Sequence, residues 1–262
     1  MGTQLSDLIL DKSCGVATIT LNRPERLNAL GPNTTLEIYQ ALEDAVQDSG
    51  IKVIVLTGEG RAFCSGGDFQ DNFLEGFKKT TLERRQRIRT GVNKLVKFLT
   101  ECEKPVIASI NGLAVGGGTT IALACDIRIT SERAKFRLPF SNIGLTPEYG
   151  CTYFLPRLVG LGKALELLYT ADFVDAEKAL RIGLINQIVA HDELKKATTE
   201  FAGKILEKPT SALGMIKSLI YRSLANDLAT QLELEAFAIS TAFKTEEHEK
   251  AVREFLRKHK KD

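Results

Sequence analysis

The amino-acid sequence predicts an α/β fold that is followed by a helical C-terminal region. Short runs rich in β-branched residues lie between glycine, asparagine and proline, as buried strands do. They alternate with segments whose apolar residues recur every three or four positions, which is typical of amphipathic helices. Strands that alternate with helices indicate an α/β domain. After about Asp192 the strand signals stop.

The first unit along the chain is a strand, a helix and a second strand. Residues 16–21 and 53–57 are the two β-branched runs. The helix between them has an apolar stripe that consists of Leu36, Tyr39, Leu42, Ala45 and Val46.

The same order of elements recurs before the C-terminal region. A helix is expected at about residues 82–99, and a strand follows at residues 106–110. A glycine-rich turn then leads into a short helix at residues 119–125 and a strand at residues 127–130. Four more helices are expected after Asp192, separated by proline and by polar residues. They cover residues 193–206, 211–224, 227–243 and 245–258.

The composition is that of an ordinary globular protein. Of the 262 residues, 44% are hydrophobic and 26% are charged, which argues against wholesale disorder. The 35 basic and 33 acidic residues give a net charge of +2, so a dedicated nucleic-acid binder is not expected. One basic run, Arg84, Arg85, Arg87 and Arg89, is interpreted as a solvated helix face, and binding of a phosphorylated small molecule is the alternative.

The cysteines and the apolar runs indicate a cellular compartment. The five cysteines are odd in number and widely spaced, which argues against a disulfide framework and for a reducing environment. The first seven residues are polar, and no apolar run approaches the roughly 18 residues that a membrane-spanning helix needs. We therefore expect a cytoplasmic protein without membrane insertion.

Several kinds of catalytic site are made improbable by residues that are missing. The three histidines, His191, His248 and His259, all lie late in the chain, whereas catalytic triads and most zinc sites need histidine. No metal site is expected. The glycine motifs that bind mononucleotide phosphates or dinucleotides are also absent from the sequence.

Two glycine-rich turns stand directly after predicted strands, at residues 58–69 and 111–118. Glycine lets the backbone approach a ligand closely and adopt positive φ, so that consecutive N–H groups point at an anion. The second turn also opens a helix, whose N-terminus favours negative charge. Cys64 lies in the first turn and is interpreted as a packing residue.

The chain resembles the crotonase (enoyl-CoA hydratase/isomerase) superfamily, and above all its 3,2-enoyl-CoA isomerases. The resemblance covers about residues 8–200 in the right order and spacing. It rests on LNRP at residues 21–24, NAL at 28–30, AFCSGGD at 62–68, KPVIASING at 104–112 with the glycines that follow, DIRI at 126–129, AKF at 134–136 and GLI at 183–185.

This resemblance implies a fold and an assembly. The expected fold is a crotonase-like spiral of repeated ββα units with a C-terminal helical region. Residues 1–200 would form the spiral core with the acyl-CoA site, and residues 201–262 a helical oligomerisation region. The family forms trimers, or hexamers built from two trimers, so a homotrimer or a dimer of trimers is expected.

The resemblance also implies an oxyanion site for an acyl-CoA thioester. In this family two peptide N–H groups hold the thioester carbonyl, and by position they belong to Gly67 and Gly117. Coenzyme A is part of the substrate, and no separate cofactor is expected. The residues expected to bind the substrate are Arg26, Ala62, Ser65, Gly66, Asp68, Phe69, Phe140 and Tyr149.

The position of the acidic groups decides which reaction is expected. Hydratases of the family carry two glutamates, and the matching positions here are Thr120 and Phe140, neither of which is an acid or base. Glu148 lies where the isomerases carry their acidic base. An apolar wall such as Phe140 is expected to raise the pKa of that carboxyl.

The expected activity is therefore an isomerase that converts a 3-enoyl-CoA to the trans-2-enoyl-CoA. Glu148 would take the proton from C2 and return it at C4, while the two N–H groups stabilise the dienolate. The alternatives are other reactions of the superfamily, such as hydration, decarboxylation or isomerisation of a cyclic or oxepin-type CoA ester. A non-catalytic acyl-CoA-binding protein is a further alternative.

Overall fold

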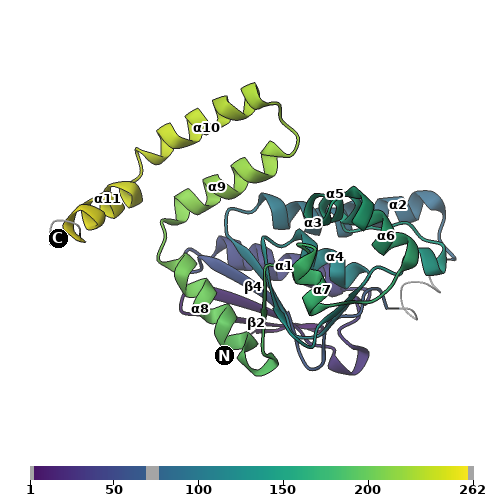
Figure 1. The fold of residues 1–262 in the computed structure, drawn as a ribbon. Coiled ribbons are helices and arrows are strands. Elements are labelled where there is room, and N and C mark those ends of the chain that lie inside the picture. The colour runs from purple at the N-terminus through teal and green to yellow at the C-terminus, as the bar shows by residue number, and fades with distance from the viewer. Residues whose placement is uncertain (1–2, 69–76, 259–262) are drawn as a thin grey trace.

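The computed structural model describes residues 3–68 and 77–258, and its core is a sheet of seven strands (Figure 1). The strand order is β1-β2-β3-β4-β6-β8-β11. Strands β1 to β3 pair antiparallel, and the others are parallel. The strands are β1 (Thr3–Gln4), β2 (Leu8–Ser13), β3 (Val16–Leu21), β4 (Val53–Gly58), β6 (Val106–Ile110), β8 (Ile127–Ser131) and β11 (Gln187–Val189).

A second, smaller sheet gives the chain its spiral form. Its order is β10-β9-β7-β5, and its strands are β5 (Ala62–Cys64), β7 (Leu113–Val115), β9 (Lys135–Arg137) and β10 (Val174–Asp175). Strands β5, β7 and β9 each come a few residues after a strand of the large sheet. Each repeat thus contributes one strand to each sheet before its helices begin, as expected for a spiral of ββα units.

Helices cover both faces of the large sheet, because alternate residues of a strand point to opposite faces. Ile54 and Leu56 belong to the main core with α1 (Thr34–Gln47), whereas Val53 and Val55 pack with α8 (Leu194–Leu206). Among the described residues, the other helices before α8 are α2 (Thr81–Thr90), α3 (Val92–Glu101), α4 (Gly117–Ala124), α5 (Cys151–Val159), α6 (Leu161–Thr170) and α7 (Ala176–Arg181), with short 3₁₀ turns at Pro24–Arg26, Ser141–Ile143 and His191–Glu193.

The prediction of one helix at residues 82–99 is wrong, because the structure divides it in two. Helix α2 (Thr81–Thr90) begins at a capping box formed by Thr80 and Glu83. It ends at Gly91, whose φ of −106° and ψ of −83° are not helical, and α3 starts on the next residue. No residue of α2 is buried, so tertiary packing does not hold α2 and α3 in line.

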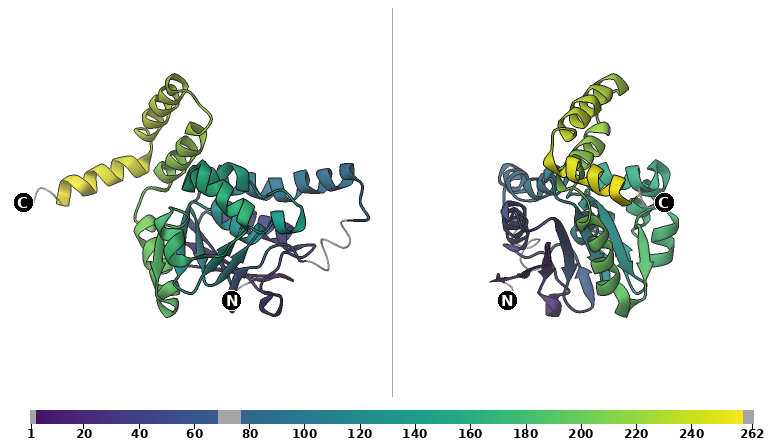
Figure 2. Two further views of the ribbon diagram at one scale, coloured as in Figure 1. Left: turned by 45° about the vertical axis from the view of Figure 1, so that its right-hand side comes forward. Right: turned by 90° about the vertical axis from the view of Figure 1, so that its left-hand side faces the viewer.

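The C-terminal arm, residues 210–258, projects from the body of the protein (Figures 1 and 2). It comprises α9 (Thr210–Ser223), α10 (Leu228–Ala242) and α11 (Glu246–Lys258), which confirms the predicted helices to within two residues. Helix α10 lies beside α9, and α11 extends away from the rest of the chain. The large apolar side chains left more than half exposed on α10 and α11 are Leu228, Leu232, Phe237, Ile239, Phe255 and Leu256.

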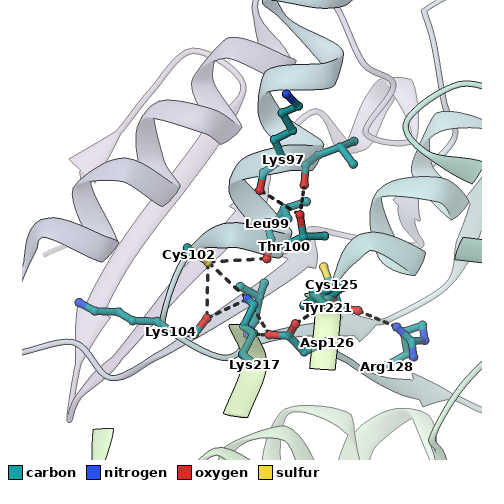
Figure 3. A network of polar contacts seen from close by, with 12 residues as sticks. Lys97, Leu99, Thr100, Cys102, Lys104, Cys125, Asp126, Arg128, Lys217 and Tyr221 are labelled. Atoms are coloured by element: carbon teal, nitrogen blue, oxygen red, sulfur yellow. Dashed lines mark hydrogen bonds and ion pairs between the residues drawn. The ribbon is translucent and has the colours of Figure 1, made fainter. Parts of the chain in front are cut away.

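A buried polar network attaches this arm to the core (Figure 3). The Lys217 ammonium on α9 lies 2.9 Å from the Asp126 carboxylate and donates to the Lys104 carbonyl and the Cys102 sulfur. One helical turn later, the Tyr221 hydroxyl donates to the other oxygen of Asp126 at 3.0 Å. Asp126 itself follows α4 directly and accepts from the Val106 N–H of β6.

In the part of the chain that the structure describes, no helix is long and apolar enough to cross a membrane. Over residues 3–68 and 77–258, no group of three or more His, Cys, Asp or Glu residues is arranged to hold a metal ion.

The Lys217–Asp126 pair is open to a direct test of stability. Removing one partner of a buried ion pair leaves the other charge uncompensated, so Lys217→Ala is expected to lower the free energy of unfolding by about 3 kcal/mol. The exposed pair Lys196–Glu193 provides the control, since Lys196→Ala should cost no more than about 0.5 kcal/mol. Urea unfolding of both variants measures the difference. Equal losses would show that the buried pair does not hold the arm.

Candidate active site

The two glycine turns contact each other because they follow neighbouring parallel strands. We call residues 65–68 the first turn and residues 115–118 the second turn. Strands β5 and β7 pair in parallel, with Ala62 opposite Leu113, so both turns lie at the same edge of the small sheet. A Cβ added to Gly66 would lie 2.7 Å from the Val115 carbonyl oxygen, and one added to Gly118 would lie 2.1 Å from that of Cys64. Only glycine allows this approach.

Hydrogen bonds to the segment before α1 orient the first turn. The Gly66 carbonyl accepts from the Leu30 N–H at 2.7 Å, and the Asp68 N–H donates to the Leu30 carbonyl at 3.0 Å. Because the peptide is planar and trans, the Gly67 N–H points away from Leu30. Within the described residues, nothing accepts a hydrogen bond from this N–H.

The second turn forms the N-terminus of α4. Gly117 is the first residue of that helix, and no described residue accepts from its N–H. Gly116 before it adopts a φ of +53° and donates to the Arg137 carbonyl. The helix dipole adds partial positive charge at this point. The structure therefore brings two unpaired N–H groups, those of Gly67 and Gly117, onto adjoining turns.

Two asparagines hold the chain just before the first turn, a role that the sequence alone did not indicate. The Asn28 side-chain amide donates to the carbonyls of Glu59 and Ala62, at 2.9 and 2.7 Å. The Asn111 amide donates to the carbonyls of Gly60 and Ala62, at 2.8 and 3.1 Å. The carbonyl of Ala62, a residue predicted to bind the substrate, thus accepts hydrogen bonds from both side-chain amides. Both asparagines lie in the motifs that carry the family resemblance, which was the available signal.

The segment that carries Glu148 packs against the second turn through Tyr149. The two residues that follow Glu148 have an unusual backbone conformation. These residues, Tyr149 and Gly150, both have positive φ, +53° and +75°. Such strain in a non-glycine residue is typical of functional sites. The Tyr149 hydroxyl hydrogen-bonds that of Thr35 at 2.9 Å, and its ring lies 3.1 Å from the place of a Cβ on Gly117. Tyr149 therefore connects the segment that carries Glu148 to the N-terminus of α4.

The environment of Glu148 raises the pKa of its carboxyl. The residue is reachable from solvent, but the surrounding protein displaces much of the carboxylate's water, and this desolvation disfavours the charged form. The positive charge of Arg84 on α2 acts in the opposite direction and is the weaker effect. Tyr149, buried against Gly117, likewise has a raised phenol pKa, caused first by desolvation and then by the charge of Glu148.

The two positions at which hydratases carry glutamate are filled by buried, non-acidic side chains. The Thr120 hydroxyl is fully buried and donates back to the carbonyls of Gly116 and Gly117. Phe140 is 7% exposed and belongs to the main core. Cys64 is buried as well, and burial raises its pKa to about 12, so the thiol stays protonated and serves packing.

The remaining predicted binding residues lie together beside the first turn. The Asp68 carboxylate is 4% exposed and lies 3.8 Å from the guanidinium of Arg26, which is 47% exposed. The Ser65 hydroxyl donates to the Arg26 carbonyl at 3.3 Å. These contacts connect the first turn to the segment around Arg26. Phe69 lies outside the described residues.

Comparison with known proteins identifies the family to which the chain is similar. The family model described as enoyl-CoA hydratase/isomerase matches residues 11–262. The short-chain-enoyl-CoA hydratase of Clostridium acetobutylicum is 40% identical over 98% of this chain and 97% of its own. The 1,2-epoxyphenylacetyl-CoA isomerase of Escherichia coli is 36% identical over 93% of each chain.

Solved structures give the same answer for the fold. The crystal structure of an enoyl-CoA hydratase/isomerase from Cupriavidus metallidurans superposes with a TM-score of 0.92 at 30% identity, covering 98% of this chain and 95% of that one. The spiral fold and the family expected from the sequence are confirmed. The chain belongs to the enoyl-CoA hydratase/isomerase family, the enzymes of the crotonase fold.

Proposed function

We propose that the protein is an acyl-CoA double-bond isomerase that converts a 3-enoyl-CoA to the trans-2-enoyl-CoA. The observation that carries the proposal is the combination of two unpaired N–H groups with one carboxyl, that of Glu148, while Thr120 and Phe140 replace the acidic pair of a hydratase. Chemistry on the CoA thioester of an enoyl group is common to the family. The proposal adds that the reaction is a shift of the double bond from C3–C4 to C2–C3.

The N–H groups of Gly67 and Gly117 would bind the thioester carbonyl oxygen and stabilise it as negative charge develops. A carboxylate is too weak a base to remove a proton next to a thioester unless the enolate is stabilised. Donors that are fixed before the reaction provide this stabilisation without reorganisation. The N-terminus of α4 adds its partial positive charge.

Glu148 would act as the single base and then as the acid. Its carboxylate takes the C2 proton of the 3-enoyl thioester, and the electrons of that C–H bond move into the thioester carbonyl. The resulting enolate is conjugated with the C3–C4 double bond and is therefore a dienolate. The protonated carboxyl then returns the proton at C4, which leaves the double bond between C2 and C3. The raised pKa of Glu148 suits both steps, because a catalytic carboxyl works best when its pKa is near the working pH.

Hydration of a trans-2-enoyl-CoA is the second candidate, and the names of relatives favour it. The Clostridium acetobutylicum relative is called a hydratase. Hydration would require Glu148 alone to activate and place a water molecule, without a second carboxyl at position 120 or 140. The Escherichia coli relative, called an isomerase, supports isomerisation and leaves a cyclic acyl group open as substrate.

We further propose that the arm mediates assembly into a homotrimer or a dimer of trimers in the cytoplasm. Exposed apolar side chains on α10 and α11 are of the kind that subunit contacts bury. The functional division at residue 200 stays a prediction; helix α8, which crosses it, packs with the core strands through Leu194 and Ala202.

The base assignment is tested by Glu148→Gln. The neutral amide cannot accept the C2 proton, so turnover of a 3-enoyl-CoA should fall by about 10²- to 10⁴-fold. Because desolvation disfavours the ionised carboxylate, the amide should leave the melting temperature at pH 7 unchanged or higher. Chromatography and mass of the products separate an isomer from a hydrated ester. Glu132→Gln on the exposed surface is the control, and full turnover by Glu148→Gln would reject the assignment.

The role of Gly117 is tested by removing its N–H group. Proline fits the first helical position, so Gly117→Pro deletes the donor while the helix itself tolerates it. We expect a loss of about 10²- to 10³-fold in kcat. Gly117→Ala keeps the N–H donor but adds a Cβ, as proline does, at 3.0 Å from Leu30 and 3.1 Å from Tyr149. It therefore measures how much of the loss in kcat comes from steric crowding alone. Equal losses in the two variants would contradict the donor role.

The pH dependence of turnover is expected to follow the titration of Glu148. Since the base must be ionised, activity should fall as the pH drops through the raised pKa. Arg84→Gln removes the charge that opposes this rise, so the acid limb of the kcat/KM profile should move to higher pH. Arg85→Gln, on the same exposed helix, should leave the limb in place. A shift to lower pH with Arg84→Gln would be inconsistent with this account.

A further inference from the structure

The first turn poses a mechanical problem, because its two central residues have no side chains. Gly66 and Gly67 are held only through their backbone, by the hydrogen bonds to Leu30 on either side of the Gly67 peptide. Glycine has the widest conformational freedom of any residue, so such a peptide rotates easily unless its neighbours are fixed. Asp68 is the first side chain after the pair, and its carboxylate is almost completely buried.

Arg23 connects the Asp68 side chain to the segment that contains Leu30, which hydrogen-bonds the first turn. Its Nη2 atom lies 3.3 Å from the Asp68 carboxylate, and its Nη1 donates to the Ala29 carbonyl at 2.8 Å. Ala29 immediately precedes Leu30, the residue that brackets the Gly67 peptide. One guanidinium therefore joins both segments of the contact that orients the Gly67 N–H. Its planar fork suits this task, since it donates in several fixed directions at once.

The surroundings of Arg23 hold the guanidinium in place. Its Nε lies 3.5 Å from the Asp7 carboxylate, which also accepts a hydrogen bond from the Thr34 hydroxyl. The side chain is only 16% exposed. Gly31 leaves the necessary space, because a Cβ there would lie 2.5 Å from Nη1 of Arg23. The backbone of Gly31 does not have a positive φ, so the space rather than the conformation requires glycine.

We propose that Arg23 is a positioning residue, which through Asp68 and Ala29 fixes the direction of the Gly67 N–H toward the substrate carbonyl. The inference rests on the proposed function, in which that N–H stabilises the enolate. Arg23 touches neither substrate nor reacting atoms. Its loss should therefore weaken the polarisation of the bound carbonyl and slow turnover while substrate binding is largely kept.

The probe is 4-(dimethylamino)cinnamoyl-CoA, whose visible absorption moves to longer wavelength when its thioester carbonyl accepts strong hydrogen bonds. Wild-type protein should give this red shift. Arg23→Gln should lose most of it and lower kcat by about 10- to 100-fold, less than complete removal of one donor costs. KM should stay within about threefold. Arg23→Lys should restore the melting temperature but not the red shift, because one ammonium cannot join all three partners.

Two further variants keep Arg23 and test the same link. Gly31→Ala pushes the guanidinium aside, and Asp68→Asn removes the charge that it holds; both should reduce the red shift and kcat in the same direction. Leu194→Ala, a core cavity on α8, is the control for simple destabilisation and should keep the full red shift. If Arg23→Gln does not fold, Gly31→Ala decides the question.

The outcomes separate this inference from the function on which it rests. If the wild-type protein binds the probe without a red shift, the proposed oxyanion site is wrong, and the role of Arg23 fails with it. A second outcome is that the wild-type protein gives the red shift, and that Arg23→Gln or Gly31→Ala also gives it in full with a kcat like that of Leu194→Ala. In that case the proposed function stands and the role of Arg23 is rejected. Loss of the shift with nearly unchanged KM supports the role.

Discussion

The close contact between the two glycine turns is the constraint on which the rest of the site depends. Gly118 packs against the Cys64 carbonyl, and Gly66 packs against that of Val115. Both contacts are so close that a Cβ on either glycine would clash with the carbonyl oxygen. Because β5 and β7 are parallel neighbours, the turns after them meet, and their unpaired N–H groups lie on adjoining segments. Strand β9 also runs parallel to β7, so the small-sheet strands of successive repeats end at this same edge.

A backbone site needs side chains elsewhere to hold it rigid. Asn28 and Asn111 fix the chain before the first turn, and the buried side chain of Tyr149 fixes the segment that carries Glu148. At the other end of α4, the Asp126–Lys217 pair ties the C-terminal arm to the core. The side-chain amides of Asn28 and Asn111 and the Lys217 ammonium are hydrogen-bonded within the protein, which is the condition under which buried polar groups stabilise an interior. The Glu148 carboxyl, by contrast, is reachable from solvent and has a raised pKa.

The sequence predicted those strands and helices that have a clear local signal. Strands β3, β4, β6 and β8 were found from their short β-branched runs, and the C-terminal helices from the lack of strand signals and the polar and proline breaks between them. The three-residue strands of the small sheet are too short to show alternation, so only the family resemblance indicated a second strand in each repeat. The break at Gly91 was missed because the apolar residues of α2 and α3 continue one helical spacing across it.

The candidate site, like the fold, could be predicted from the sequence only in part. The glycine-rich turns were visible in the sequence because a close backbone approach requires glycine, and the family resemblance then selected Gly67 and Gly117 by position. The structure places these two residues on adjoining turns, and their role in binding stays a prediction. The uses of Asn28 and Asn111 could not be predicted, since each joins residues about 30 to 50 positions away, and only the tertiary structure brings those together. Asp68 was expected to bind the substrate, and this stays a prediction; its carboxylate lies 3.3 Å from Arg23 and 3.8 Å from Arg26, which the sequence did not indicate.

The most direct test of the central claim is exchange of α-hydrogens of CoA thioesters with deuterium oxide, followed by mass spectrometry. The assay reports enolate formation without requiring that any double bond move. With short, long and cyclic acyl-CoA esters, including phenylacetyl-CoA, the account predicts incorporation of deuterium next to the thioester of at least one ester, and none with Glu148→Gln. Tight binding of the esters by the wild-type protein without any exchange would contradict it.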